Sequence, residues 1–137
     1  MTDLTEKYKL IAKDVFTNLG TGHTEFIYHR AMEIELQLQH IVYESEKRVL
    51  ITYVKGDKKY TIGEERIDLF IPDESLIIEL KAITGSPKES EIAQLKKYYR
   101  ELLKMGVAAK TGLVINFPQP GVKNAKDDVE FIVVQFD

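Results

Sequence analysis

The sequence contains no cysteine, which excludes a disulfide framework, a zinc–thiolate site and a cysteine nucleophile. It also lacks an apolar run near the ~20 residues that a membrane-spanning helix needs, and no signal-peptide pattern stands at its start. Internal repeats, low-complexity tracts and interdomain linkers are absent too. We therefore expect a soluble, intracellular protein without a membrane partner, folded as a single domain over residues 1–137.

An excess of positive charge is also missing, because the formal net charge is −3. Strong non-specific binding to a polyanion usually requires a basic surface. The apolar fraction of 44% and the charged fraction of 30% are typical of an ordinary globular protein and allow a real core. Any function on a polyanion must therefore depend on a local site.

Two helices are expected at the start of the chain. Apolar residues at intervals of three and four predict the first over residues 4–19, with Asp3 as a cap and Gly20 as its end. The second follows the break at 20–22 and runs to about Gln39. Its apolar stripe consists of Ile27, Ala31, Ile34 and Leu38.

The middle of the chain predicts strands. An alternating pattern begins near Glu46, the dipeptide Gly56–Asp57 supplies a hairpin turn, and a second strand returns over residues 59–70. Gly63 marks a bulge or bend in that strand. A further short strand ends at Lys81.

After Lys81 the period changes from 2 to 3.6. Ser86, Pro87 and Glu89 form a capping-box start for a helix that ends at Gly106. Strands over 111–117 and 129–136 follow, separated by a polar loop at 118–126. The helix should cross the sheet so that the strand from Thr111 runs parallel to the strand that ends at Lys81. The predicted fold is α/β, a mixed β-sheet flanked by helices in the order ααβββαββ.

The segment 66–81 carries the most information. A tight turn at residues 72–75 would set Asp68 directly opposite Glu79, with Cβ atoms ~4.5–5.5 Å apart, so that the carboxylates should repel. Lys81 shares the face of Glu79. The opposite face is expected to be continuously apolar and to fix the register; it consists of Ile67, Leu69, Ile71, Leu76, Ile78 and Leu80. This arrangement resembles a divalent-metal site beside a lysine, and the alternative is a solvated face with a surface Glu79–Lys81 contact.

These residues resemble the PD-(D/E)xK nuclease superfamily, which has the restriction-endonuclease-like fold. The match consists of Asp68 followed by Glu79-Leu80-Lys81, although Ile67 stands where the name places proline. Gly22 to Tyr28 is similar to the signature of the small GxxExxY proteins. Gln94 to Tyr98 resembles the QxxxY motif of RecB-type nucleases, and the strand 113–117 also looks like the GxxExxY family.

The resemblance implies a divalent-metal site. Asp68 and Glu79 would be the ligands, with the backbone carbonyl of Leu80 as a third. Lys81 would orient or deprotonate the attacking water, or stabilise charge on the phosphate. Glu25 would act as a ligand, directly or through water; its alternative is a carboxylate favoured by the helix dipole at a helix start.

Supporting roles follow for the third helix. Gln94 and Tyr98 stand one turn apart and would contact phosphate or hold the metal carboxylates, while packing is the alternative for Tyr98. Lys97 belongs to a basic stripe that either guides a phosphate backbone or is a solvated face. The stripe consists of Lys96, Lys97, Arg100 and Lys104.

On the second helix, Tyr28 would either hydrogen-bond an active-site group or pack in the core. Its neighbours His29 and Arg30 could approach a phosphate, but exposed helix positions are the simpler account. His23 and His40 lack partners at a metal-ligand spacing and receive no role.

The expected function is a Mg²⁺- or Mn²⁺-dependent nuclease that acts on DNA rather than RNA, in repair, recombination or nucleic-acid processing. A domain of this size cannot surround a duplex, so a homodimer is expected. The low net charge favours weak DNA affinity or a partner that delivers the substrate. The alternative is a catalytically silent nucleic-acid-binding or regulatory module on the same fold. A third reading places the turn elsewhere, so that Asp68 and Glu79 share no site.

Overall fold

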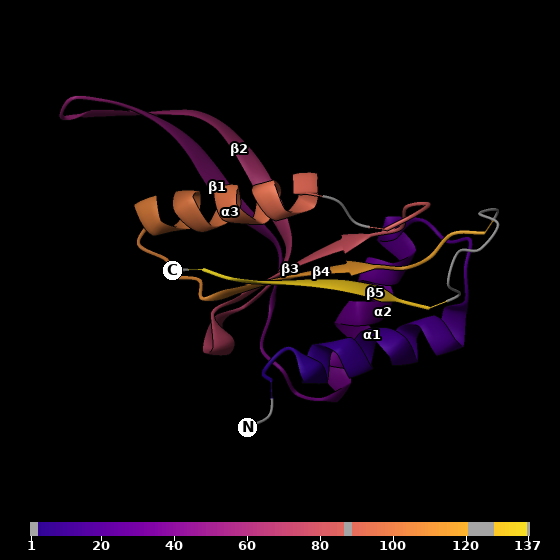
Figure 1. Ribbon diagram of the computed structural model, residues 1–137. Helices are drawn as coiled ribbons and strands as arrows, with labels where there is room; N and C mark the ends of the chain where they lie inside the picture. Colours follow the sequence, from indigo (N-terminus) through magenta and orange to yellow (C-terminus); the bar gives the residue numbers. More distant parts are fainter. Residues whose placement is uncertain (1–2, 87–88, 121–127, 137) are drawn as a thin grey trace.

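The computed structural model describes residues 3–86, 89–120 and 128–136 (Figure 1). The element order ααβββαββ is the predicted one, which confirms the α/β class. In chain order the elements are α1 (Glu6–Leu19), α2 (Glu25–Leu38), β1 (Glu44–Lys55), β2 (Lys58–Ile71), β3 (Leu76–Lys81), α3 (Glu89–Lys104), β4 (Thr111–Asn116) and β5 (Glu130–Gln135). No helix in these described ranges is long and apolar enough to cross a membrane.

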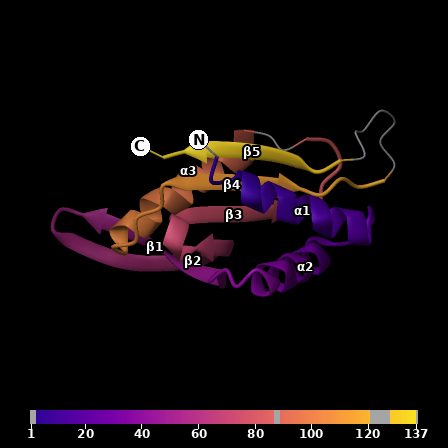
Figure 2. The ribbon, with the colours of Figure 1, turned by 90° about the horizontal axis from the view of Figure 1, so that it is seen from below.

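The five strands form one mixed sheet in the order β1-β2-β3-β4-β5. β3 and β4 are parallel, and the other neighbours are antiparallel. The crossing by α3 therefore returns the chain parallel to β3, as expected. Helices α1 and α2 lie next to each other on one face of the sheet, and α3 covers the other (Figures 1 and 2).

Each face of the sheet has its own core. One cluster joins α1 and α2 to the sheet through buried residues such as Tyr8, Met32 and Ile78. The second lies under α3 and includes Leu95 and Leu102. At Gly112, a Cβ atom would lie only 2.9 Å from Leu95 Cδ1 and 2.9 Å from Phe136 Cζ. The absence of a side chain on β4 therefore allows α3 to pack closely.

The apolar stripe that the sequence indicated on α2 is not the buried one. Ile34 and Leu38 are 56% and 68% exposed, and Ile27 is exposed as well. The buried residues are Tyr28, His29, Met32 and Leu36. Positions 28, 32 and 36 recur every four residues and form a second stripe, one position further along the helix. Tertiary packing selected that stripe because its larger side chains fill the space above the sheet.

The hairpin of β2 and β3 has the expected turn and register. Residues Pro72–Glu74 form one turn of 3₁₀ helix, and Ser75 takes the left-handed conformation at φ 51°. Leu69 pairs with Ile78, so the next position sets Asp68 opposite Glu79. The expected continuous apolar face is wrong at Ile67, which packs in the cluster under α3 rather than with Leu69.

The hairpin of β1 and β2 projects beyond the sheet (Figure 1). Its turn lies at Gly56–Asp57, as predicted. The register shifts between Ile51 and Thr52, which pair with Gly63 and Thr61, so Ile62 is the extra residue of a bulge beside Gly63. The predicted Ser86–Pro87–Glu89 capping box and the loop at 118–126 lie partly outside the described residues. Ser86 donates a hydrogen bond to Glu130 Oε2 at 2.5 Å.

Candidate active site

Two carboxylates join β2 to β3 where the described ladder ends. The Asp68 N–H donates to Glu79 Oε2 at 3.2 Å, and the Leu80 N–H donates to Asp68 Oδ2 at 2.8 Å. Each carboxylate therefore takes the place that a backbone carbonyl would occupy in an ordinary ladder. This exchange fixes both side chains relative to the backbone, which prepares them to act together.

Burial makes this pair electrostatically unusual. Glu79 is only 4% exposed. Burial, and then the hydrogen bond and negative charge of Asp68, raise the pKa of Glu79 well above its usual range. A nearby cation would offset this cost, since Lys81 only partly opposes it. The donor set, two carboxylates with the backbone carbonyl of Leu80 beside Glu79, is the kind that Mg²⁺ and Mn²⁺ prefer, so the residues fit a divalent cation.

Glu25 approaches the pair from α2, as its first residue. The residue is exposed, but the pKa of its carboxyl group is raised. Partial desolvation is the largest cause; the charge of Lys81 opposes the rise, and the charge of Asp68 adds to it. The structure therefore brings Glu25, Asp68, Glu79 and Lys81 into one electrostatic neighbourhood, although they come from three elements.

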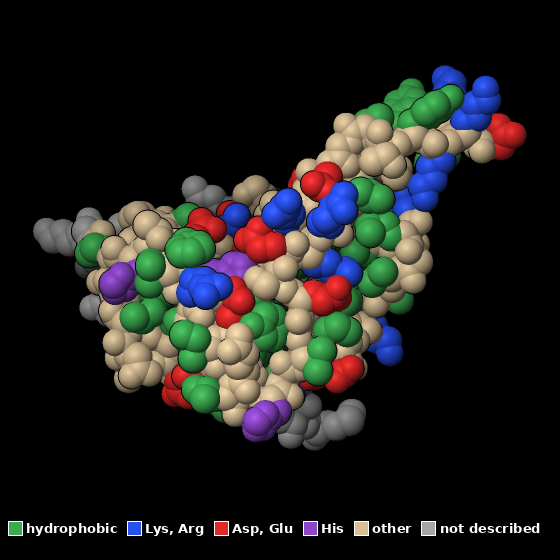
Figure 3. All heavy atoms as spheres, turned by 180° about the vertical axis from the view of Figure 1, so that it is seen from behind, with side chains coloured by type: hydrophobic (Ala, Val, Ile, Leu, Met, Phe, Trp, Pro, Cys, Tyr) green, Lys and Arg blue, Asp and Glu red, His purple; other side chains and the backbone are tan. Residues whose placement is uncertain are grey.

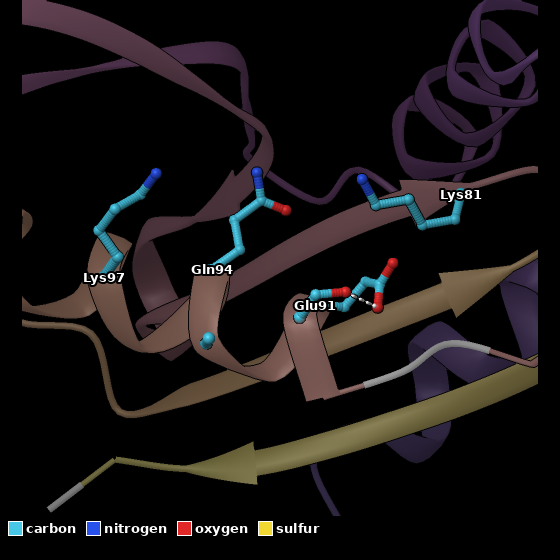
Figure 4. Close-up of a pocket in the computed structure, with 6 residues that line it drawn as sticks. Lys81, Glu91, Gln94 and Lys97 are labelled. Atoms are coloured by element: carbon cyan, nitrogen blue, oxygen red, sulfur yellow. Dashed lines mark hydrogen bonds between the residues drawn. The ribbon is translucent and has the colours of Figure 1, made fainter.

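A hollow of about 410 Å³ opens beside Lys81 (Figure 4). Lys81 enters it from β3, and Gln94 and Lys97 line it from α3. The Lys97 ammonium forms an ion pair with Glu65 Oε1 at 2.6 Å. Ser90 and Glu91 also line the hollow, so it presents amine, amide, hydroxyl and carboxylate groups around Lys81, two residues along β3 from Glu79.

Gln94 and Tyr98 act as one unit on α3. The Gln94 amide donates to the Tyr98 hydroxyl at 3.0 Å, and that hydroxyl donates to the Arg66 carbonyl at 3.4 Å. Burial, and then the charges of Glu79 and Glu65, raise the Tyr98 pKa, so the phenol stays neutral. Tyr98 is both buried in the α3 core and adjacent to the carboxylate pair, so the two roles weighed for it are compatible.

Two residues of α2 are not drawn into this group. The Tyr28 hydroxyl donates to the Gly20 carbonyl at 2.6 Å, and its ring stacks on Phe117 at 4.3 Å between centroids, which is the packing alternative. The Arg30 side chain is 65% exposed and lies 3.9 Å from Glu33.

His29 is a residue that the sequence reasoning placed wrongly. It is buried, and its Nε2 lies 2.9 Å from Ser45 Oγ and 3.2 Å from Glu33 Oε2. One ligand atom each of His29, Glu46 and Asp68 lies within 4.8 Å of the others. Glu46 adopts the left-handed φ of 56° within β1. No sequence pattern predicts that conformation, so the sequence did not indicate Glu46 as part of this group.

Asn116 is a second residue that the sequence did not single out. It is fully buried at the end of β4, where it pairs with Lys81 of β3. Its side chain accepts from the Ile83 N–H at 2.9 Å and donates to the Gly85 carbonyl at 3.0 Å. Asn116 thereby holds the chain that leaves Lys81. A lone polar residue that closes an apolar strand was the available signal.

Comparison with known proteins agrees with this geometry. The family model of the PD-(D/E)XK nuclease superfamily matches residues 2–128. The chain belongs to the PD-(D/E)XK nuclease superfamily. The match supports a nuclease, a class that typically uses divalent metals and acts on nucleic acid. It names the superfamily only, so the GxxExxY assignment stays a prediction. No curated protein sequence matches.

One solved structure shows the same fold. This PD-(D/E)XK chain is similar to the crystal structure of SSO0001 with a TM-score of 0.59 and 22% identity, over 80% of this chain and 48% of that one. It thus spans about half the length of that protein. The similarity to a phage-related exonuclease from Haemophilus somnus 129PT is weaker, with a TM-score of 0.41 and 12% identity over 99% of this chain and 74% of that one. The restriction-endonuclease-like α/β fold is confirmed.

Proposed function

We propose that this protein is a metal-dependent nuclease that hydrolyses phosphodiester bonds of DNA. The observation that carries the proposal is the pair Asp68–Glu79, two carboxylates held by backbone amides beside Lys81. A structural hairpin gains nothing from two adjacent carboxyl groups of which one, Glu79, is buried, because ionising both costs free energy when no cation is present.

Asp68 and Glu79 would hold Mg²⁺ or Mn²⁺, with the Leu80 carbonyl as a third ligand and Glu25 as a ligand directly or through water. Bound there, the cation would supply charge neutralisation at the phosphate, an activated water and stabilisation of the leaving oxygen. His29 and Glu46, whose ligand atoms lie within 4.8 Å of one another and of Asp68, would be further candidate ligands for a cation at Asp68.

Lys81 projects into the hollow beside the carboxylates, where it would stabilise charge on the phosphate or orient the attacking water. Lys97 and Gln94 on the opposite wall would contact the phosphate backbone. The neutral phenol hydroxyl of Tyr98 would lie next to Glu79 and help to hold that carboxyl group. Arg30, although exposed, remains a candidate phosphate contact on the second turn of α2.

The alternative is a catalytically silent binding module, and one experiment separates the two. Calorimetry with Mn²⁺ should show binding by the wild type and none by Asp68→Asn, while Asp14→Asn on α1, an exposed position, binds as the wild type does. Cleavage of branched, single-stranded and duplex DNA and of RNA should require Mg²⁺ or Mn²⁺ and should fall at least 100-fold in Asp68→Asn and Lys81→Ala.

The titration is repeated with a DNA oligonucleotide present, because a phosphate can complete a site. Equal Mn²⁺ binding by the wild type and Asp68→Asn in both titrations would overturn the proposed site. Cleavage that persists in folded Asp68→Asn would overturn the proposed chemistry. A homodimer and a partner that delivers the substrate remain proposals, which sedimentation of the wild type and its complex with DNA would test.

A further inference from the structure

The hairpin of β1 and β2 forms an arm, which we define as residues 52–62. It extends past the other strands, because β2 pairs with β3 only at residues 69–71 (Figures 1 and 3). Every residue from 53 to 64 is exposed. A two-stranded ribbon is only marginally stable by itself, so the arm is maintained for a reason other than the core of the domain.

The arm exposes large apolar side chains. Tyr53, Val54, Tyr60 and Ile62 are 53%, 54%, 50% and 64% exposed. Tyr53 and Tyr60 are directly opposite each other in the ladder, so the two rings share one face. Concentrated exposed apolar groups on a monomer mark an interaction surface.

The charge of the arm is opposite to that of the rest of the chain. It carries Lys55, Lys58 and Lys59 against Asp57, a net +2, whereas the whole chain is −3 and the remainder therefore −5. Lys59, two residues after the Gly56–Asp57 turn, donates to the Lys104 carbonyl at 3.1 Å, which ties the arm to the end of α3. Among the described residues, no carboxylate forms an ion pair with Lys55 or Lys58. Their charge is available to a polyanion.

Helix α3 connects the arm to the candidate active site. It begins beside Lys81 at the hollow and ends at the base of the arm, where Met105 Sδ also accepts from the Leu50 N–H at 3.4 Å. Lys97 and Lys104 along this path are paired with Glu65 and Glu101. Lys96 and Arg100 on α3 form no ion pair among the described residues either, so unpaired positive charge extends along α3 to the arm.

We propose that the arm binds the major groove of B-form duplex DNA about one helical turn from the phosphate that is cut. This inference rests on the proposed function and names its substrate as a duplex with a flank. Ten residues separate Asp68 from Lys58, which is at most ~34 Å of extended strand, close to the ~34 Å length of one turn of DNA. A major groove ~12 Å wide admits a two-stranded ribbon, and the deep, narrow major groove of A-form RNA does not. Lys55 and Lys58 contact phosphates, and the Tyr53–Tyr60 face packs on sugars and base edges.

The test measures duplex binding over a range of salt concentrations, in an Asp68→Asn background that prevents cleavage. Two phosphate contacts make the slope of log K against log salt more negative by about 1.8. On a 30-base-pair duplex, Lys55→Ala/Lys58→Ala should therefore give a slope less negative by about 1.8 and bind roughly 60-fold more weakly at 0.1 M salt. Neither change is expected on an 8-base-pair duplex. The matched control is Lys13→Ala/Lys110→Ala, two exposed lysines away from the arm, which keeps the parental slope.

Cleavage provides a second readout in the otherwise unchanged chain. The arm variants, including Tyr53→Ala/Tyr60→Ala, should cut duplexes with long flanks more slowly and duplexes with flanks under ten base pairs at the wild-type rate. Unchanged slopes and flank dependence in the arm variants, while the wild type still cuts DNA, would overturn the arm inference alone. Absence of any DNA cleavage by the wild type would overturn the proposed function. A change of sedimenting mass in Tyr53→Ala/Tyr60→Ala with unaltered DNA affinity would instead assign the arm to a protein contact.

Discussion

Replacing Glu79 by glutamine should change how the stability of the metal-free protein depends on pH. The side chain is buried, and its amide oxygen can still accept the hydrogen bond from the Asp68 N–H. The substitution removes the titrating carboxyl group of Glu79, whose pKa is raised by burial and then by Asp68. The perturbation therefore isolates the charge of the carboxylate pair from its packing.

The sign follows from proton linkage. Because the folded pKa of Glu79 is raised, the folded protein holds a proton that the unfolded chain releases above a pKa of about 4.3. The stability that this group contributes is fully present below that pH and is lost as the pH rises through the folded pKa. One proton corresponds to a slope of at most about 1.4 kcal/mol per pH unit.

Urea denaturation in EDTA at pH 5, 6 and 7 provides the measurement. The free energy of unfolding of the wild type should fall with pH more steeply than that of Glu79→Gln. Glu101→Gln is the matched control, because it alters a buried glutamate paired with Lys104 but leaves the Asp68–Glu79 pair in place. Parallel pH profiles for the wild type and Glu79→Gln, with equal m-values, would refute the reasoning.

Two further predictions concern the packing around the sheet. Gly112→Ala should lower the free energy of unfolding by about 1–3 kcal/mol, because its Cβ would lie 2.9 Å from atoms of Leu95 and Phe136; thermal or urea denaturation measures the loss, and an unchanged midpoint would contradict it. Tyr8 is buried and donates to the Glu74 carboxylate, and burial, followed by this partner, raises its pKa. The wild type should therefore lose stability above pH 10, where the unfolded tyrosine ionises, more steeply than Tyr8→Phe does; equal losses in urea titrations at pH 9 and pH 11 would exclude this assignment.

Most helices and strands of this fold could be predicted from the sequence, because the spacing of apolar residues in each one is a local pattern. The alternation over β1 and β2, the Gly56–Asp57 turn and the strand-helix-strand order after Lys81 all follow from short-range patterns. The Asp68–Glu79 register was also accessible, since a turn at residues 72–75 and a two-residue period determine it. These features depend on neighbours within about a dozen residues.

The errors occurred where distant packing decides. Helix α2 carries two adjacent apolar stripes, and a sequence alone does not show which one meets the sheet. Ile67 and Leu69 pack in different clusters, and Glu46, which lies between their partners Lys47 and Ser45, has a left-handed backbone that no sequence pattern indicates. His29 is buried where Ser45 of β1, sixteen residues away, meets its ring, a contact that a local pattern does not show.

The backbone N–H groups of Asp68 and Leu80 donate to carboxylates rather than to backbone carbonyls. These two amides can therefore serve as spectroscopic reporters of the candidate active site. Two backbone amide protons end on the side chains that would coordinate a cation, at 3.2 Å and 2.8 Å between heavy atoms. Electron withdrawal from those carboxylates weakens them as acceptors, so the chemical shifts and exchange rates of these two amides follow the occupancy of the site directly. The amide resonances of Asp68 and Leu80 would thus show whether the cation site is occupied, without a label on the substrate.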